Sequence, residues 1–170
     1  TSFLLSSTIV DAEYFFLVFQ GIPYFHGFFH SYLGASILGV AVALFMYPLR
    51  ELMERVLELF LIRQKSSFKR ILITSLLGAY SHILIDSFLY GEMKPFYPLG
   101  FNPFLNVVPA SAVYEFCGAS FLLGLVVYAY RAVRVWRSGE SIARTKGLVK
   151  WFVIVLFAVV AVVFGSVLLM

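Results

Sequence analysis

The chain has few charged residues and only one cysteine. Of its 170 residues, 13% are charged and 61% are hydrophobic, and the mean hydropathy is +0.92. Soluble domains average about 25% charged and about 45–50% apolar residues, so this composition excludes an ordinary soluble domain and indicates an integral membrane protein. A single cysteine, Cys117, excludes an internal disulfide, and its apolar surroundings in the sequence are typical of a small core residue.

Basic residues are also missing from long parts of the chain. Residues 1–27 contain none, and residues 91–111 contain only Lys94. Of the 13 Lys and Arg residues, six fall in residues 49–70 and six in residues 131–150. By the positive-inside rule these two segments face the cytoplasm, and the N-terminal segment, the 91–111 loop and the C-terminus face the other side. The net charge of +4 therefore reflects membrane topology, and we expect no nucleic-acid partner.

Four apolar segments are long enough to cross about 30 Å of hydrocarbon, which takes about 20 residues. They are Phe28–Tyr47, Ile71–Tyr90, Ala112–Tyr130 and Leu148–Met170. We therefore predict an all-α integral membrane protein, with residues 1–170 forming a single transmembrane domain built as a four-helix transmembrane bundle. The chain starts at Thr1 within an apolar stretch. We expect further residues upstream, and we interpret residues 1–10 as the tail of a signal or of another transmembrane helix.

Small residues predict that the first two spans are neighbours. Ala35 and Gly39 are four residues apart in the first span, and Ser75 and Ala79 are four apart in the second. This spacing lets membrane helices approach each other closely.

The two segments between these spans differ in character. Leu49–Ile62 alternates apolar and charged residues at helical spacing, which predicts an amphipathic helix on the cytoplasmic side, lying on the membrane surface or packed against the end of the bundle. Gly91–Ser111 contains four prolines among several aromatic residues, which forbids a regular helix. This outer loop is either a cap or lid at the membrane interface or an ordinary connection held by aromatic packing.

The three histidines are the most informative residues. His26 and His30 are four apart, as are His82 and Asp86, so each pair lies on one face if the backbone there is helical. Ionisable groups inside a membrane are costly to bury and mark functional sites. The loop charges place both pairs at the outer ends of the first two spans.

Further carboxylates fall at the same membrane face. Asp11 and Glu13 belong to the outer N-terminal segment, and Glu115 lies near the outer start of the third span. Imidazole and carboxylate donors suit divalent first-row ions, with zinc preferred. The donors for one or two such ions are Asp11, His26, His30, His82 and Asp86. A site with an open position can turn water into a nucleophile, and Glu13 or Glu115 would then act as general base or orient a ligand.

Other interpretations remain open at this stage. Two histidines on adjacent helices can ligate haem iron, although haem does not need the neighbouring carboxylates. A proton or ion path is disfavoured because the inner halves of the spans contain no ionisable residue. A membrane adaptor would make the metal-like spacings a coincidence.

Four segments of the sequence resemble a known family. They are Asp11-Ala12-Glu13, then His26-Gly27-Phe28-Phe29-His30-Ser31, then Gly78-Ala79-Tyr80-Ser81-His82-Ile83-Leu84-Ile85-Asp86, followed by Lys94-Pro95-Phe96-Tyr97-Pro98-Leu99. In this order they resemble the YdjM-like family of membrane-bound metal-dependent hydrolases, over about residues 5–105. The chain departs from the family pattern at Val10, Glu13 and Gly27, where proline, aspartate and arginine are usual.

The resemblance implies a function and a location. It implies that the five donors named above are metal ligands and that the protein lies in a prokaryotic-type cell membrane. The His-x-x-x-Asp element is also similar to one in zinc-dependent phospholipase C, which suggests phosphoester chemistry. We therefore hypothesise a hydrolase that uses metal-activated water on an ester or phosphoester, with a lipid as substrate. The alternative is a non-catalytic membrane protein that binds metal or haem or serves as an adaptor.

Overall fold

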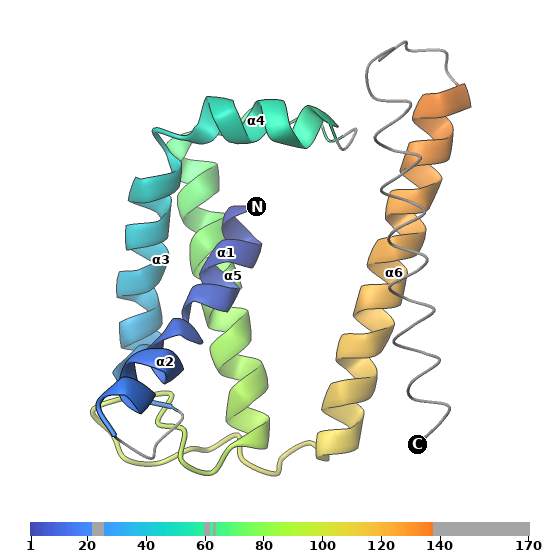
Figure 1. Cartoon of the computed structure of the whole chain (residues 1–170). Coiled ribbons are helices and arrows are strands. Elements are labelled where there is room, and N and C mark those ends of the chain that lie inside the picture. The colour runs from blue at the N-terminus through green and yellow to red at the C-terminus, as the bar shows by residue number, and fades with distance from the viewer. Residues whose placement is uncertain (22–25, 60–61, 63, 138–170) are drawn as a thin grey trace. The chain divides into compact units, whose positions relative to one another are not determined.

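The structure is a computed structural model that describes residues 1–21, 26–59, 62 and 64–137. All regular elements within this part are helical, which confirms the predicted all-α class at that level. In chain order they are α1 (Ser2–Ile9), α2 (Ala12–Phe19), the short 3-10 helix η1 (Phe28–His30), α3 (Tyr32–Met46), α4 (Arg50–Leu59), α5 (Phe68–Leu89) and α6 (Ala110–Arg137) (Figure 1).

The chain divides into two compact units. Residues 1–51 and 66–124 form the first unit, which contains every predicted site residue. Residues 52–65 and 125–170 form the second. A single domain over residues 1–170 stays a prediction.

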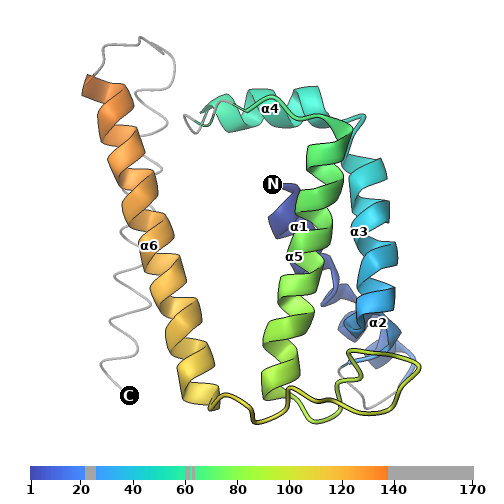
Figure 2. The same ribbon diagram turned by 180° about the vertical axis from the view of Figure 1, so that it is seen from behind.

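Three helices pack together in the first unit. α5 contacts both α1 and α3, and α1 also contacts α3 (Figures 1 and 2). Small residues make this packing close, because Ala35, Ser75 and Ala79 are fully buried. A Cβ atom on Gly39 would lie 2.9 Å from the side chain of Leu76 on α5. The small-residue spacing therefore correctly predicts that the first two spans are neighbours.

The approach of α1 to α5 is closer still. Any Cβ atom on Gly78 would meet the backbone carbonyl of Phe3. The Ser6 hydroxyl donates a hydrogen bond of 2.6 Å to the backbone carbonyl of Ser75. This interhelical bond satisfies a buried hydroxyl within an apolar surrounding, where an unpaired one would be costly.

Capping residues determine where α3 and α5 begin. The hydroxyl of Ser31 accepts from the backbone N–H of Gly34 at 3.1 Å, and the hydroxyl of Ser67 accepts from that of Arg70 at 3.4 Å. Serine at the N-cap satisfies an N–H group that the helix itself leaves unpaired. α3 ends before Pro48, as expected from the lack of a proline N–H and the clash of its ring.

The segment from 91 to 109 forms a non-helical loop, as its prolines predict. The carbonyl of Pro95 accepts from the N–H of Tyr32 at 2.9 Å, which ties the loop to the start of α3. The side-chain amide of Asn102 donates to the carbonyls of Ser87 and Tyr90 at 2.8 and 3.2 Å, which caps the end of α5. The loop is therefore fixed against both helices at one end of the first unit.

A small core lies beside this end. It consists of Val10, Ala35, Ala79, Ile83 and Met93, all at most 1% exposed. These residues come from the α1–α2 break, α3, α5 and the loop. Because four segments meet here, the side chains next to this core are held in defined positions.

Three helices of the described part are long and apolar enough to cross a membrane. They are Ser2–Phe19, which comprises α1 and α2 counted together, Phe68–Leu89 and Ala110–Val135. The second and third of them agree with the predicted spans Ile71–Tyr90 and Ala112–Tyr130, and the first extends the apolar stretch that the sequence shows in residues 1–10.

The first predicted span, Phe28–Tyr47, differs from the structure. Its opening residues form η1, and α3 has only 15 residues, or about 22 Å at 1.5 Å per residue. α3 reaches the length of a membrane span only if it is counted together with α4, although the two helices are bent by 79° relative to each other. Counted in this way, the pair is a fourth candidate span. The predicted amphipathic helix is confirmed as α4, and the predicted span Leu148–Met170 lies outside the described residues.

Candidate metal centre

Asp11 lies at the break between α1 and α2. It is the N-cap residue of α2, a position where an aspartate ordinarily accepts a hydrogen bond from the helix backbone. Here its side chain makes no such bond. Its Oδ1 atom instead lies 3.1 Å from Nε2 of His82 and 3.7 Å from Nε2 of His30. The break in the helix thus presents a carboxylate to two histidines.

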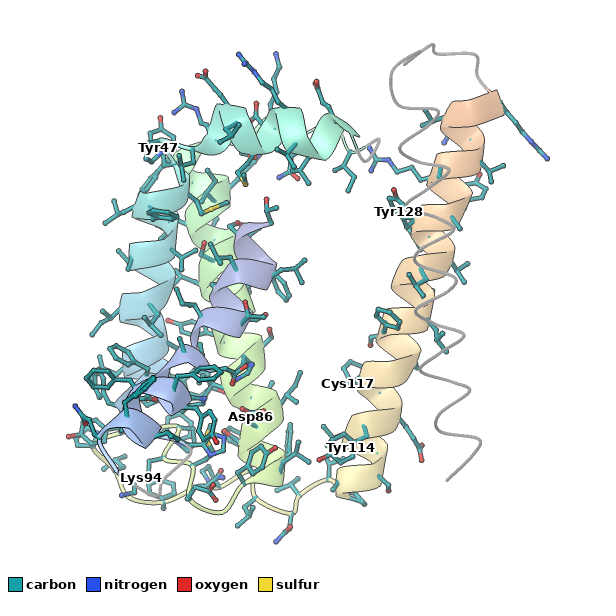
Figure 3. All side chains as sticks on the ribbon, viewed as in Figure 1. Tyr47, Asp86, Lys94, Tyr114, Cys117 and Tyr128 are labelled. Carbon is teal, nitrogen blue, oxygen red and sulfur yellow. The ribbon has the colours of Figure 1, made fainter. Side chains whose placement is uncertain are left out.

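His82 and Asp86 share one face of α5, as their spacing predicts. Nε2 of His82 lies 3.1 Å from Oδ2 of Asp86. Figure 3 shows Asp86 in the part of α5 that is nearer the loop. Both side chains are largely buried, at 18% and 15% exposed. The neighbouring Ile83 is fully buried in the core, which fixes the rotation of this helix turn.

His30 ends the short helix η1 and is almost completely buried. Its Nδ1 atom lies 2.8 Å from Oε2 of Glu13. An ionised carboxylate can only accept, so Nδ1 carries a proton, and in the neutral imidazole Nε2 then keeps its lone pair. That Nε2 atom faces Asp11. The carboxylate behind the ring therefore sets the tautomer that a metal ligand requires.

Glu13 also holds the backbone around His30. Its two carboxylate oxygens accept from the N–H groups of Gly27, Phe29 and His30 at 3.0–3.2 Å. With four hydrogen bonds, the carboxylate has little capacity left to take a further proton. Of its two predicted roles, the structure favours orientation of a ligand over general base.

Gly27 allows this arrangement. A Cβ atom at Gly27 would lie 2.8 Å from the carboxyl carbon of Glu13. A side chain at this position would therefore displace the carboxylate of Glu13 from η1. The glycine at the place where the resembling family has arginine is therefore needed for the contact of Glu13 with η1.

His26 occupies a neighbouring position. It precedes η1, so it does not share a helical face with His30, and the helical placement predicted for this pair is wrong. The two rings nevertheless meet edge to face with centroids 4.7 Å apart. Nδ1 of His26 donates to Oε1 of Glu92 at 3.0 Å, and its Nε2 lies 3.8 Å from Oδ2 of Asp86.

Glu92 is a functional candidate that the sequence analysis missed. It lies in the loop, and no helical spacing links it to the histidines. The pKa of its carboxyl is lowered, chiefly by a hydrogen bond from its own backbone N–H and also by His26.

Four of the predicted ligands form one group. Asp11, His30, His82 and Asp86 each offer a ligand atom, and these four atoms lie within 4.8 Å of one another. Nε2 of His82 is buried and lies 3.1 Å from Oδ1 of Asp11 and 3.1 Å from Oδ2 of Asp86. A buried imidazole nitrogen that faces two carboxylate oxygens is suited to a metal ion. The donor set therefore fits a divalent cation.

Glu115 is not part of this group. It is exposed on α6, and no contact links its carboxylate with the four ligands among the described residues. Its catalytic role stays a prediction.

Comparisons of the chain with models of known families, with curated proteins and with solved structures found no match. The functional argument therefore depends on the geometry of the site.

Proposed function

We propose that the protein is a membrane-embedded metal-dependent hydrolase that acts on an ester or phosphoester bond. The observation that carries this proposal is the convergence of Asp11, His30, His82 and Asp86, from three separate segments, within 4.8 Å. Two imidazoles and two carboxylates are donors typical of catalytic zinc or manganese centres, whereas structural zinc sites are mostly rich in cysteine.

The exposure of the ligands supports catalysis over a structural role. The side chain of His30 is 1% exposed, but that of Asp11 is 57% exposed. The group is thus buried on one side and accessible on the other, as a site with an open coordination position requires. A divalent ion held there would supply Lewis acidity, which makes water a nucleophile near neutral pH.

The chain's own residues have distinct tasks in this proposal. His30, His82, Asp11 and Asp86 bind the ion, and Glu13 orients His30 through Nδ1. The aromatic rings of the loop, among them Phe96, pack beside the start of α3. This packing would limit the access of water from one side.

We further propose zinc as the ion, the extracytoplasmic face as the site's location and a lipid as the substrate. The basic residues between α3 and α5 lie at the end of these helices opposite the loop and the donor group, so the positive-inside rule favours this orientation. A site at headgroup depth is suited to an amphipathic substrate. We also propose that the protein forms a four-helix transmembrane bundle and that it is related to the YdjM-like family.

Haem binding is the weaker alternative. Axial histidines ligate haem iron from opposite faces of a flat macrocycle, which lies between the two imidazoles. Here Oδ1 of Asp11 lies within 3.7 Å of Nε2 of both His30 and His82. A carboxylate oxygen this close to both imidazoles suits a small cation better.

The test is hydrolysis by the purified full chain in detergent. The probes are bis-p-nitrophenyl phosphate, p-nitrophenyl butyrate and mixed phospholipid micelles, each assayed after chelation and after addition of Zn²⁺ or Mn²⁺. We expect hydrolysis of at least one probe that chelation abolishes, that the metal restores and that Asp11→Asn lacks. The matched control Glu51→Gln alters an exposed carboxylate on α4 and should leave the rate unchanged. Metal binding without hydrolysis of any probe would contradict the hydrolase proposal and favour a non-catalytic metal protein.

A further inference from the structure

His26 is largely buried and makes several contacts, although it is not one of the four ligands. Its side chain is only 9% exposed. Its ring packs against Tyr90 with centroids 4.5 Å apart and against the edge of His30 at 4.7 Å. Two ring contacts and one hydrogen bond leave the imidazole little freedom to rotate.

The hydrogen bond of His26 repeats the arrangement seen at His30. The carboxylate of Glu13 accepts a hydrogen bond from Nδ1 of His30. In the same way, the carboxylate of Glu92 accepts one from Nδ1 of His26 at 3.0 Å. In both cases Nε2 of the neutral imidazole is the nitrogen that keeps a lone pair. A carboxylate behind the imidazole is the usual support of a histidine that ligates a metal.

Nε2 of His26 lies near the carboxylate of Asp86, which is one of the four proposed ligands. Nε2 lies 3.8 Å from Oδ2 of Asp86, and the same oxygen lies 3.1 Å from Nε2 of His82. Two donors that each lie about 2.0–2.2 Å from one ion are separated by roughly 3–4.4 Å. Both separations are therefore compatible with an ion between the atoms.

The five donors do not form one group in this geometry. The ligand atoms of Asp11, His30, His82 and Asp86 all lie within 4.8 Å of one another, whereas His26 is not part of that group although its Nε2 lies 3.8 Å from Oδ2 of Asp86. Carboxylates bridge pairs of ions about 3.5–4 Å apart in two-metal hydrolytic sites. Asp86 lies between His82 and His26 and is placed to act as such a bridge.

We propose that His26 and Asp86 form a second cation subsite, with Glu92 as the residue that positions His26, so that the centre holds two divalent ions bridged by Asp86. This inference rests on the proposed metal centre and extends it. The second subsite has two protein donors, so water or substrate oxygens complete its coordination. It should bind its ion more weakly than the four-residue group does.

The experiment is a metal titration of the chelator-stripped full chain in detergent. Bound Mn²⁺ is measured by equilibrium dialysis and plasma mass spectrometry, and the spin coupling between ions by electron paramagnetic resonance. His26→Phe keeps a ring against Tyr90 but removes the donor. Glu92→Gln keeps the shape but removes the charge, and Glu51→Gln, which changes an exposed carboxylate on α4, is the matched control. Circular dichroism and thermal unfolding verify the fold of each variant.

We expect two Mn²⁺ per wild-type chain with a spin-coupled signal. His26→Phe should retain one ion at unchanged affinity and lose the coupling. Glu92→Gln should still bind two ions, with the affinity for the second ion lowered about 10–100-fold. The control variant should bind metal as the wild type does.

Each contrary result has a distinct meaning. One ion in the wild type and in His26→Phe alike would overturn the second subsite but leave the four-residue centre intact. One ion in the wild type and none in His26→Phe would make His26 a ligand of a single ion and also overturn the inference. Two ions in both would exclude His26 as a ligand. No ion in the wild type would refute the proposed metal centre and this inference together.

Discussion

At the scale of single residues, the carboxylates behind the histidines determine what the site can bind. Glu13 contacts Nδ1 of His30 and three backbone N–H groups, so it fixes both the ring and its loop. Glu13→Gln should lower the affinity for the first metal ion about 10–100-fold, because the neutral amide supports the imidazole less well. Competition of the purified variant with a zinc-sensitive dye measures this affinity. An unchanged affinity would exclude Glu13 from ligand orientation.

Gly27 permits the contact between Glu13 and η1, because it has no side chain that would occupy the position of the carboxylate. Gly27→Ala places a methyl group against the carboxylate of Glu13, which must then withdraw from η1. We expect the metal affinity to fall in the same direction as in Glu13→Gln. The matched control is Gly100→Ala in the outer loop, where a Cβ atom would meet nothing within 4 Å. Equal metal affinity in the two glycine variants would contradict the structural role of Gly27.

Sequence reasoning identified most of this site but not all of its geometry. His82 and Asp86 were predictable because both lie on one continuous helix, where spacing defines the face. His26 was placed on a helical face that does not exist, because Gly27 and a 3-10 turn interrupt the helix there. Glu92 gave no signal, since loop residues have no periodicity.

At the scale of elements, the contact between α1 and α5 places Asp11 beside His82. Gly78 makes this contact possible, because a Cβ atom there would collide with the backbone of Phe3. Gly78→Ala should therefore destabilise the protein by about 1–3 kcal/mol, the usual cost of overpacking. Thermal unfolding in detergent, followed by circular dichroism, measures the change.

The control for Gly78 is another helical glycine. Among the described residues, a Cβ atom on Gly124 of α6 would meet nothing within 4 Å. Because alanine favours a helix over glycine by about 1 kcal/mol, Gly124→Ala should leave the melting temperature unchanged or raise it. Equal destabilisation in both variants would show that α1 does not pack on α5 as described.

The elements also show where sequence reasoning succeeds and fails. The prolines of the 91–109 loop and the amphipathic pattern of α4 were sufficient to predict both elements. The start of α3 was not predictable from hydropathy, because apolar residues continue through η1 although the helix begins only after the Ser31 cap. Hydropathy measures affinity for lipid, whereas capping determines where a helix begins.

At the scale of the whole molecule, the proposed topology places the loop outside and the 49–70 segment in the cytoplasm. Single cysteines introduced into a Cys117→Ser background test this directly. Lys94→Cys should react with a membrane-impermeant maleimide in intact cells, and Lys65→Cys should react only after the membrane is permeabilised. The reverse pattern would place the candidate centre at the cytoplasmic face.

The central claim is that Asp11, His30, His82 and Asp86 hold a divalent metal ion. The most direct measurement is the metal content of the purified protein by plasma mass spectrometry, for the wild type beside His82→Ala and His82→Gln. We predict at least one zinc or manganese ion per wild-type chain, and a loss of the ion bound by the four-residue group in both variants, with circular dichroism unchanged. Wild-type protein that remains free of metal after purification without chelator and after metal addition would contradict the account. So would variants that bind as much metal as the wild type.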